Sequence, residues 1–304
     1  MNSMRGQWKQ WLIPVGLTLL TIASVIFVLE SDGTRGGSTG EPEKTLAQMT
    51  VVTQPALSGP LRFGKKLSFI SPKVSEAEGV TFATQWLRDG KPIEGATELD
   101  YRTGIDDVGS TISVEIKATK SGFKPLTMKA EANGPIGHKR DRRVTVEYTI
   151  ASRGDVLTAS DEFAQNVAKI LDDPRGWRSD GIEFKQVETG GDLTINLSTS
   201  AKVPSFSSTC SSYWSCRTGD NVVINEDRWL ESTDTWKAAP GTTLAAYQHM
   251  VVNHEVGHWL GLSHSYCRSQ GEKAPLMMQQ SKGLNGCKPN PWPLESEMNP
   301  PRFR

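Results

Sequence analysis

The pattern of hydrophobic and polar positions changes along the chain, and residues 55–135 form its first regular part. Short runs with alternating hydrophobic residues recur there, separated by glycine, proline and Asp-Gly turns. The runs occupy residues 61–70, 80–90, 110–122 and 125–132. Regularly spaced short strands of this kind predict a small all-β sandwich. Trp86 lies inside one run, so we expect it in the core of the sandwich.

From residue 136 to residue 304 the pattern mixes strand and helix periods. Residues 143–150 place hydrophobic side chains at every second position, which predicts a half-buried strand. Ser160 is the expected N-cap of a helix that carries hydrophobic residues at helical spacing as far as Leu171. A longer helix is expected at 243–262, and further strands at 181–187, 192–198 and 221–229. The rest of this part is rich in proline, glycine and asparagine without a regular period. This order predicts an α+β or α/β domain with a small mixed sheet, and we adopt the α+β class.

The N-terminal pattern predicts export from the cytoplasm. Residues 12–29 form an uncharged stretch of 18 residues, long enough for one transmembrane helix. Arg5 and Lys9 precede it and Glu30 follows, so the positive-inside rule places the N-terminus in the cytoplasm and the remainder outside. A cleaved signal peptide is the alternative, and it would release a secreted protein.

Together these patterns divide the chain into four regions. We expect a cytoplasmic tip and transmembrane signal anchor (1–30), a flexible linker (31–54), a β-sandwich (55–135) and a second folded domain (136–304).

Charge adds little to this picture. The chain has 34 basic and 34 acidic residues and a formal net charge of zero. The basic cluster at 138–143 lacks the aromatic and glycine residues that accompany nucleic-acid binding, so it is interpreted as a solvated linker. We therefore expect no nucleic-acid partner.

All four cysteines lie in the second domain, and their even number agrees with an oxidising compartment. Three pairings are possible. Pairing Cys210 with Cys216 and Cys267 with Cys287 is preferred, because each bond would close one loop near a cluster of histidines. No Cys-x-x-Cys spacing supports zinc binding by these cysteines.

Three of the five histidines lie close together near the end of the longer helix. His254 and His258 are four residues apart, so their rings leave the helix on the same side and can bind one metal ion. Glu255 is directed about 100° around the helix, within reach of a water at such a metal. Gly261 permits a sharp turn, after which His264 can return as a third ligand. Three protein ligands leave a fourth position for water, which is typical of a catalytic zinc site.

The segment from His254 to His264 resembles the metzincin signature, His-Glu-x-x-His-x-x-Gly-x-x-His. The resemblance implies a zincin-like fold, Zn²⁺ as cofactor and Glu255 as the catalytic base. Metzincins also place a methionine-containing turn beneath the metal. Met277 is the expected methionine here and Met278 the alternative. No tyrosine follows this turn, so the transition-state tyrosine of some metzincins has no counterpart at that position.

Two further resemblances concern larger parts of the chain. Residues 84–119 resemble bacterial immunoglobulin-like repeats of cell-surface proteins, through Trp86, the Asp89-Gly90 turn and Tyr101. The C-terminal half, roughly residues 140–298, is similar to a bacterial family of exported, uncharacterised metzincin-like proteins. The first resemblance implies an immunoglobulin-like domain that contacts a cell-wall or surface partner.

The function expected from these features is that of a membrane-anchored, extracellular zinc metalloprotease. Its zinc would be held by His254, His258 and His264, and Glu255 would activate the water that attacks a peptide bond. A protein or peptide is the expected substrate. Two alternatives remain open: a non-catalytic cell-envelope binding protein with a structural zinc, and a zinc amidase that acts on cell-wall peptides.

Overall fold

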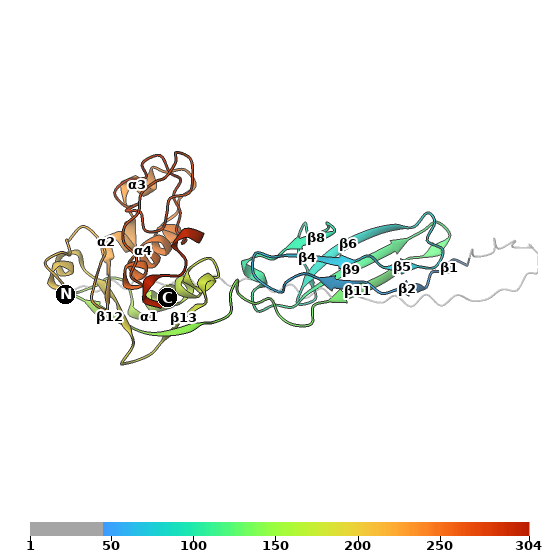
Figure 1. Cartoon of the computed structure of the whole chain (residues 1–304), viewed down its shortest axis with the longest axis horizontal. Helices are drawn as coiled ribbons and strands as arrows, with labels where there is room; N and C mark the ends of the chain where they lie inside the picture. Colours follow the sequence, from blue (N-terminus) through green and yellow to red (C-terminus); the bar gives the residue numbers. More distant parts are fainter. Residues whose placement is uncertain (1–44, 304) are drawn as a thin grey trace, which may run out of the picture. The chain divides into compact units, whose positions relative to one another are not determined.

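The computed structural model describes residues 45–303, and strands dominate its secondary structure, with few helices (Figure 1). The predicted transmembrane segment and most of the predicted linker lie outside the described residues. Among residues 45–303, no helix has both the length and the apolar character needed to cross a membrane.

The first part of the described chain consists almost entirely of strands. Its largest sheet has four strands in the order β11-β9-β6-β7, and a three-stranded sheet has the order β3-β4-β8. Two short pairs, β1-β10 and β2-β5, complete this part. The strands are β1 (Ala47–Gln48), β2 (Val51–Thr53), β3 (Ala56–Ser58), β4 (Lys66–Ile70), β5 (Lys73–Val74), β6 (Thr81–Arg88), β7 (Lys91–Pro92), β8 (Asp100–Arg102), β9 (Ile112–Thr119), β10 (Phe123–Lys124) and β11 (Leu126–Glu131), and a 3₁₀ turn covers Ile105–Asp107.

Trp86 of β6 lies at the centre of the core of this part, as its position in an alternating run predicts. Its side chain has no exposed surface, and its ring contacts Phe69 of β4 and Tyr101 of β8. The indole N–H donates to the carbonyl oxygen of Glu98 at 2.9 Å, which satisfies its polar atom. Residues of both larger sheets therefore share one hydrophobic core.

The second part contains a mixed five-stranded sheet in the order β13-β12-β14-β16-β15. The first four strands pair in parallel, and β15 pairs antiparallel with β16 at the edge. The elements are β12 (Val144–Arg153), α1 (Ser160–Asp172), β13 (Ile182–Gln186), β14 (Leu193–Ser198), β15 (Cys216–Thr218), β16 (Asn221–Asn225), α2 (Glu226–Glu231), α3 (Asp234–Lys237) and α4 (Leu244–Trp259), with 3₁₀ turns at Trp177–Asp180, Ser200–Ser205, Glu295–Glu297 and Pro301–Phe303.

Strand β12 confirms the predicted alternation, since Val146 and Tyr148 are each only 1% exposed. They belong to a core that also contains residues of α1, α2 and α4, including Phe163 and Trp229, whose ring centroids lie 4.9 Å apart. The helices therefore bury their apolar side chains against the sheet.

The predicted strand at 221–229 is wrong in its second half, where α2 begins at Glu226. Asn225 caps this helix, because its side-chain oxygen accepts from the backbone N–H groups of Asp227 and Arg228. A polar residue that satisfies free amides at a helix start favours the helix over a continued strand.

The predicted capping role of Ser160 is also wrong. Ala159 occupies the N-cap of α1, and Ser160 is the first helical residue. Asp161 stands in the first turn and accepts from the backbone N–H of Glu162 at 3.0 Å. A local carboxylate thus supplies an acceptor at the helix start, where it also opposes the helix dipole.

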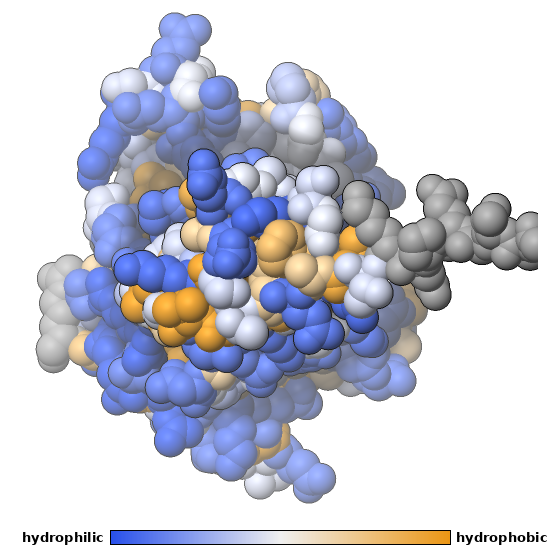
Figure 2. Space-filling model, turned by 90° about the vertical axis from the view of Figure 1, so that its right-hand side faces the viewer, coloured by the Kyte–Doolittle hydropathy of each residue, from blue (hydrophilic) through white to orange (hydrophobic). Residues whose placement is uncertain are grey.

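The surface is mixed in character. Figure 2 shows hydrophobic residues in small areas separated by hydrophilic ones on the face that it presents. Some large apolar side chains are nevertheless well exposed, among them Leu157, Tyr213 and Tyr266. Single exposed apolar residues are ordinary on soluble surfaces, so they indicate no particular partner.

Candidate metal centre

Helix α4 positions the first two histidines. Thr243 caps its start by accepting from the backbone N–H of Ala246 at 3.0 Å. One turn separates His254 from His258, and their ring centroids lie 4.8 Å apart. The two imidazoles therefore leave the helix as neighbours, as their spacing predicts.

The chain reverses direction immediately after α4. The N–H of Gly261 donates to His258 O at 3.1 Å, and the N–H of Leu262 donates to Gly257 O at 3.0 Å. These two bonds form a Schellman motif, which requires a left-handed residue directly after the helix cap. Gly261 meets that requirement with φ of +95°. The reversal brings the ring of His264 within 4.6 Å of His258 and 5.4 Å of His254.

The three histidines form a cluster that can bind a metal. One ring nitrogen from each lies within 4.8 Å of the others, and Nε2 of His258 lies 3.0 Å from Nε2 of His264. Nδ1 of His254 pairs with Leu276 O, and Nδ1 of His258 pairs with Leu262 O, each at 2.8 Å. Backbone partners of this kind orient imidazole ligands and leave the other nitrogen for the metal. The donor set fits a divalent transition ion such as zinc.

Burial keeps these imidazoles in the neutral form that binds metals. It lowers the pKa of His254 to about 3, with a further contribution from the neighbouring His258. Burial also lowers the pKa values of His258 and His264. At neutral pH no proton therefore competes with a metal for these nitrogens.

Glu255 is a buried carboxylate beside the histidines. Only 6% of its surface is exposed, and within residues 45–303 its side chain makes no hydrogen bond or ion pair. Burial raises its pKa to about 8, against the opposing effect of the positive Arg217. A carboxylate without a protein partner is free to exchange a proton with a molecule in the adjacent cavity.

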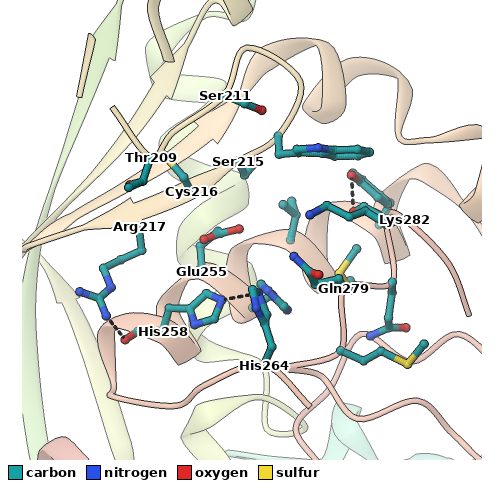
Figure 3. Close-up of a pocket in the computed structure, with 18 residues that line it drawn as sticks. Thr209, Ser211, Ser215, Cys216, Arg217, Glu255, His258, His264, Gln279 and Lys282 are labelled. Carbon is teal, nitrogen blue, oxygen red and sulfur yellow. Dashed lines mark hydrogen bonds between the residues drawn. The ribbon is translucent and has the colours of Figure 1, made fainter. Parts of the chain in front are cut away.

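The histidines and Glu255 line one open cavity of about 560 Å³. Its walls come from the segment around β15 on one side and from residues 278–282 on the other. Figure 3 shows Arg217 and Lys282 on opposite sides of the histidines. The guanidinium of Arg217 donates to His258 O at 2.9 Å, at the C-terminal end of α4. Among the described residues, Glu255 is the only carboxylate that lines this cavity.

Met277 packs directly against the histidine helix. A Cβ atom on Gly257 would lie 2.4 Å from its sulfur, so Met277 occupies the space that a larger residue at position 257 would need. Met277 is 1% exposed, whereas Met278 lines the cavity. Met277 thus packs against α4 and Met278 faces the cavity, and the role of Met277 in a methionine turn beneath a metal stays a prediction.

A second buried carboxylate holds the turn that carries Met277. Glu297 accepts from the backbone N–H groups of Leu276 and Met277 at 2.9 and 2.8 Å, and from that of Leu294 at 2.8 Å. It therefore fixes the segment whose carbonyl group bonds His254. Sequence reasoning missed Glu297, because two of its three partners lie about 20 residues away and all three are backbone N–H groups.

The disulfide prediction is confirmed. Cys210 is bonded to Cys216, and Cys267 to Cys287. Cys216 itself lines the cavity, next to Arg217, and the second bond closes the segment that includes Lys282. Both walls of the cavity are therefore cross-linked.

Two further residues of α4 have structural roles. Tyr247 is buried, and its hydroxyl lies 2.9 Å from Ser281 Oγ. The ring of His249 lies 4.8 Å from that of Trp292, and its Nδ1 is buried without a hydrogen-bond partner among residues 45–303. His249 is therefore a partly exposed residue whose ring packs against Trp292.

Comparison with known families gives one match. Residues 113–289 match the sequence model of a family described as "protein of unknown function (DUF3152)". The matched region begins in β9 and includes all three histidines, Glu255 and Met277. No curated protein matches the chain.

Proposed function

The chain belongs to the family described as protein of unknown function (DUF3152), and from that premise we propose that it is a metal-dependent peptidase of the metzincin type. The observation that carries the proposal is the cavity that Glu255 shares with His254, His258 and His264. A purely structural metal site has no need of a buried, unpaired carboxylate beside it.

The fold assignment is part of the same proposal. We assign residues 136–304 to a zincin-like domain, supported by the mixed sheet, the histidine helix and the methionine beneath it. The strands before it are assigned to an immunoglobulin-like sandwich, supported by the shared core around Trp86.

Export is proposed from two independent features. The uncharged segment at 12–29 is long enough for a signal anchor, and both disulfides suit an oxidising compartment. The peptidase would then act outside the cytoplasm, attached to the membrane or secreted after cleavage.

The residues of the cavity have distinct roles in peptide hydrolysis. Zinc, when bound by the three histidines, supplies a Lewis acid that polarises the peptide carbonyl and acidifies water. In its ionised form, Glu255 takes a proton from the attacking water, and it then delivers this proton to the leaving amine. Leu276 O and Leu262 O hold the rings of His254 and His258 in the tautomer that directs Nε2 to the metal.

The test combines metal analysis with digestion of a diverse peptide mixture by the full chain. We expect one zinc per chain and cleavage that disappears in Glu255→Gln, a change that keeps the size of the side chain. Glu188→Gln alters an exposed glutamate outside the cavity and serves as the matched control. Zinc bound stoichiometrically, together with no cleavage that depends on Glu255, would contradict the peptidase and favour a structural metal.

Metal removal provides a second test. His264→Ala should abolish stoichiometric zinc binding, whereas His249→Ala should retain it, since His249 packs on Trp292 away from the cluster. Equal zinc contents in the two variants would contradict the assigned ligands.

A further inference from the structure

A second cavity opens beside the metal centre. It has a volume of about 250 Å³ and shares four lining residues with the larger cavity: His264, Met278, Gln279 and Lys282. Because one metal-binding histidine lines both cavities, a peptide at the metal can place a neighbouring side chain or its chain end in the second one.

The charged side chain that lines the second cavity is positive. Lys282 is the only cationic side chain that lines it, and no aspartate or glutamate does so among the described residues. The ammonium of Lys282 makes no ion pair within residues 45–303. It lies 5.6 Å from the centre of the ring of Trp214, a residue of the larger cavity, so Lys282 is shared by the two cavities.

Lys282 lines the larger cavity too, together with the three histidines. With Arg217 on the other side of the histidines, the open cavity has two cations and one buried carboxylate. Such a field attracts anionic groups and disfavours cationic ones.

Neutral groups of the second cavity complete a site for a carboxylate. Gln279 and Asn285 carry amide N–H donors, which suit carboxylate oxygens. Tyr266 and Met278 provide apolar surface for the methylene groups that precede a carboxylate.

We propose that the second cavity binds a carboxylate of the peptide substrate, with Lys282 as its counter-ion, and that the protein therefore selects peptides with a carboxylate close to the reacting bond. This proposal rests on the proposed peptidase function. The carboxylate can come from an aspartate or glutamate side chain or from the C-terminus of the peptide.

Binding and cleavage test the proposal separately. The probes are neutral peptides with acetylated and amidated ends, in which a single Glu, Gln or Lys is placed at successive positions. A second series ends in a free or amidated C-terminus at successive lengths. Binding is measured by fluorescence anisotropy to the zinc-loaded Glu255→Gln chain, and cleavage is measured with the unaltered chain.

We expect the best-placed Glu to improve binding about five-fold over Gln at the same position, the effect of a partly exposed ion pair. Lys282→Gln should remove this preference and Lys282→Glu should shift it towards Lys. Lys273→Gln should leave it unchanged, because Lys273 is an exposed lysine of the same disulfide-closed segment that lines neither cavity. The series that shows the larger preference identifies the source of the carboxylate.

The proposal would be overturned if Glu and Gln peptides bound equally and free and amidated C-termini also bound equally. A preference that survives Lys282→Gln would overturn it as well. Loss of cleavage for every peptide would instead refute the peptidase, and the binding series would still decide whether Lys282 recognises a carboxylate.

Discussion

Nδ1 of His254 lies 2.8 Å from the carbonyl oxygen of Leu276, 22 residues later in the chain. The next residue, Met277, packs against Gly257 in the same helix as His254. Helix α4 and the segment that follows the cluster are therefore joined at two adjacent points. A change that displaces this segment should therefore also displace His254, one of the three candidate metal ligands.

Glu297 should act on the metal site from a distance, as a positioning residue. Glu297→Ala removes the acceptor for the backbone N–H groups of Leu276 and Met277. We expect zinc affinity to fall about tenfold, because the partner of His254 is no longer held in place. Competition with a chromophoric chelator measures this change. Glu272→Ala, at an exposed position, should leave the affinity as it is, and equal affinities in the two variants would show that Glu297 has no positioning role.

Gly257→Ala should destabilise the protein. The added Cβ would lie 2.4 Å from the sulfur of Met277 and 3.0 Å from Trp177, so the side chains beneath the helix must move. Overpacking of this kind lowers the free energy of unfolding by about 1–3 kcal/mol, which urea denaturation measures. In the Met277→Ala background the same substitution should lower the free energy of unfolding by a smaller amount. An unchanged cost in that background would contradict direct packing between the two residues.

Removal of the two disulfides should have unequal effects. The double variant Cys267→Ser, Cys287→Ser lacks the disulfide between residues that are 20 positions apart. We expect its free energy of unfolding to fall by about 3 kcal/mol. The disulfide between Cys210 and Cys216 joins residues only 6 positions apart. Its removal should lower the free energy of unfolding by about 2 kcal/mol.

The longer bond should also affect the metal site. It closes the segment that contains Leu276, so its removal should weaken zinc binding more than removal of the shorter bond. Chelator competition compares the two double variants under identical conditions. If removal of the shorter bond weakened zinc binding more, the segment with Leu276 would keep its position without the longer cross-link.

Tyr101 should contribute to the stability of the strand-rich part in alkaline solution. Burial raises its pKa to about 12, and its hydroxyl donates to the buried Asp107 at 2.8 Å. In the unfolded chain this hydroxyl ionises near pH 10, which is a lower pH than in the folded protein. The stability gained from neutral Tyr101 is thus complete below pH 10 and decreases as the pH rises towards 12.

Tyr101→Phe isolates this effect. Because the variant lacks the hydrogen bond to Asp107, its free energy of unfolding at neutral pH should be about 1 kcal/mol lower. Its free energy of unfolding should then fall less steeply than that of the unaltered protein between pH 10 and 12. Parallel curves for the two proteins, from urea denaturation at each pH, would contradict the assignment.

Local chemistry made much of the candidate site predictable. A spacing of four residues places His254 and His258 together on any α-helix, and Gly261 is the residue that a left-handed helix end requires. The alternating runs likewise predicted β6, β9 and β12, because a strand with one buried face repeats every two residues. The strand predicted at 221–229 failed at Asn225, where a side-chain cap started a helix.

Other features depended on contacts between distant residues. Met277 and Met278 are equivalent in the sequence pattern, and only packing directs one towards Gly257 and the other into the cavity. The partners of Glu297 are backbone N–H groups, which every sequence contains, so no side-chain pattern indicates them.

The sequence by itself determined the types of the three candidate ligands, the spacing of two of them on the helix and the turn that returns the third. The spacing and the turn follow from local backbone geometry. The tertiary structure decided what surrounds them: the carbonyl partner of His254, the carboxylate that holds it, and the placement of Arg217 and Lys282 on opposite sides of the histidines. These arrangements join elements far apart in the chain, and only the packing of β15 and of the C-terminal segment against α4 brings them together.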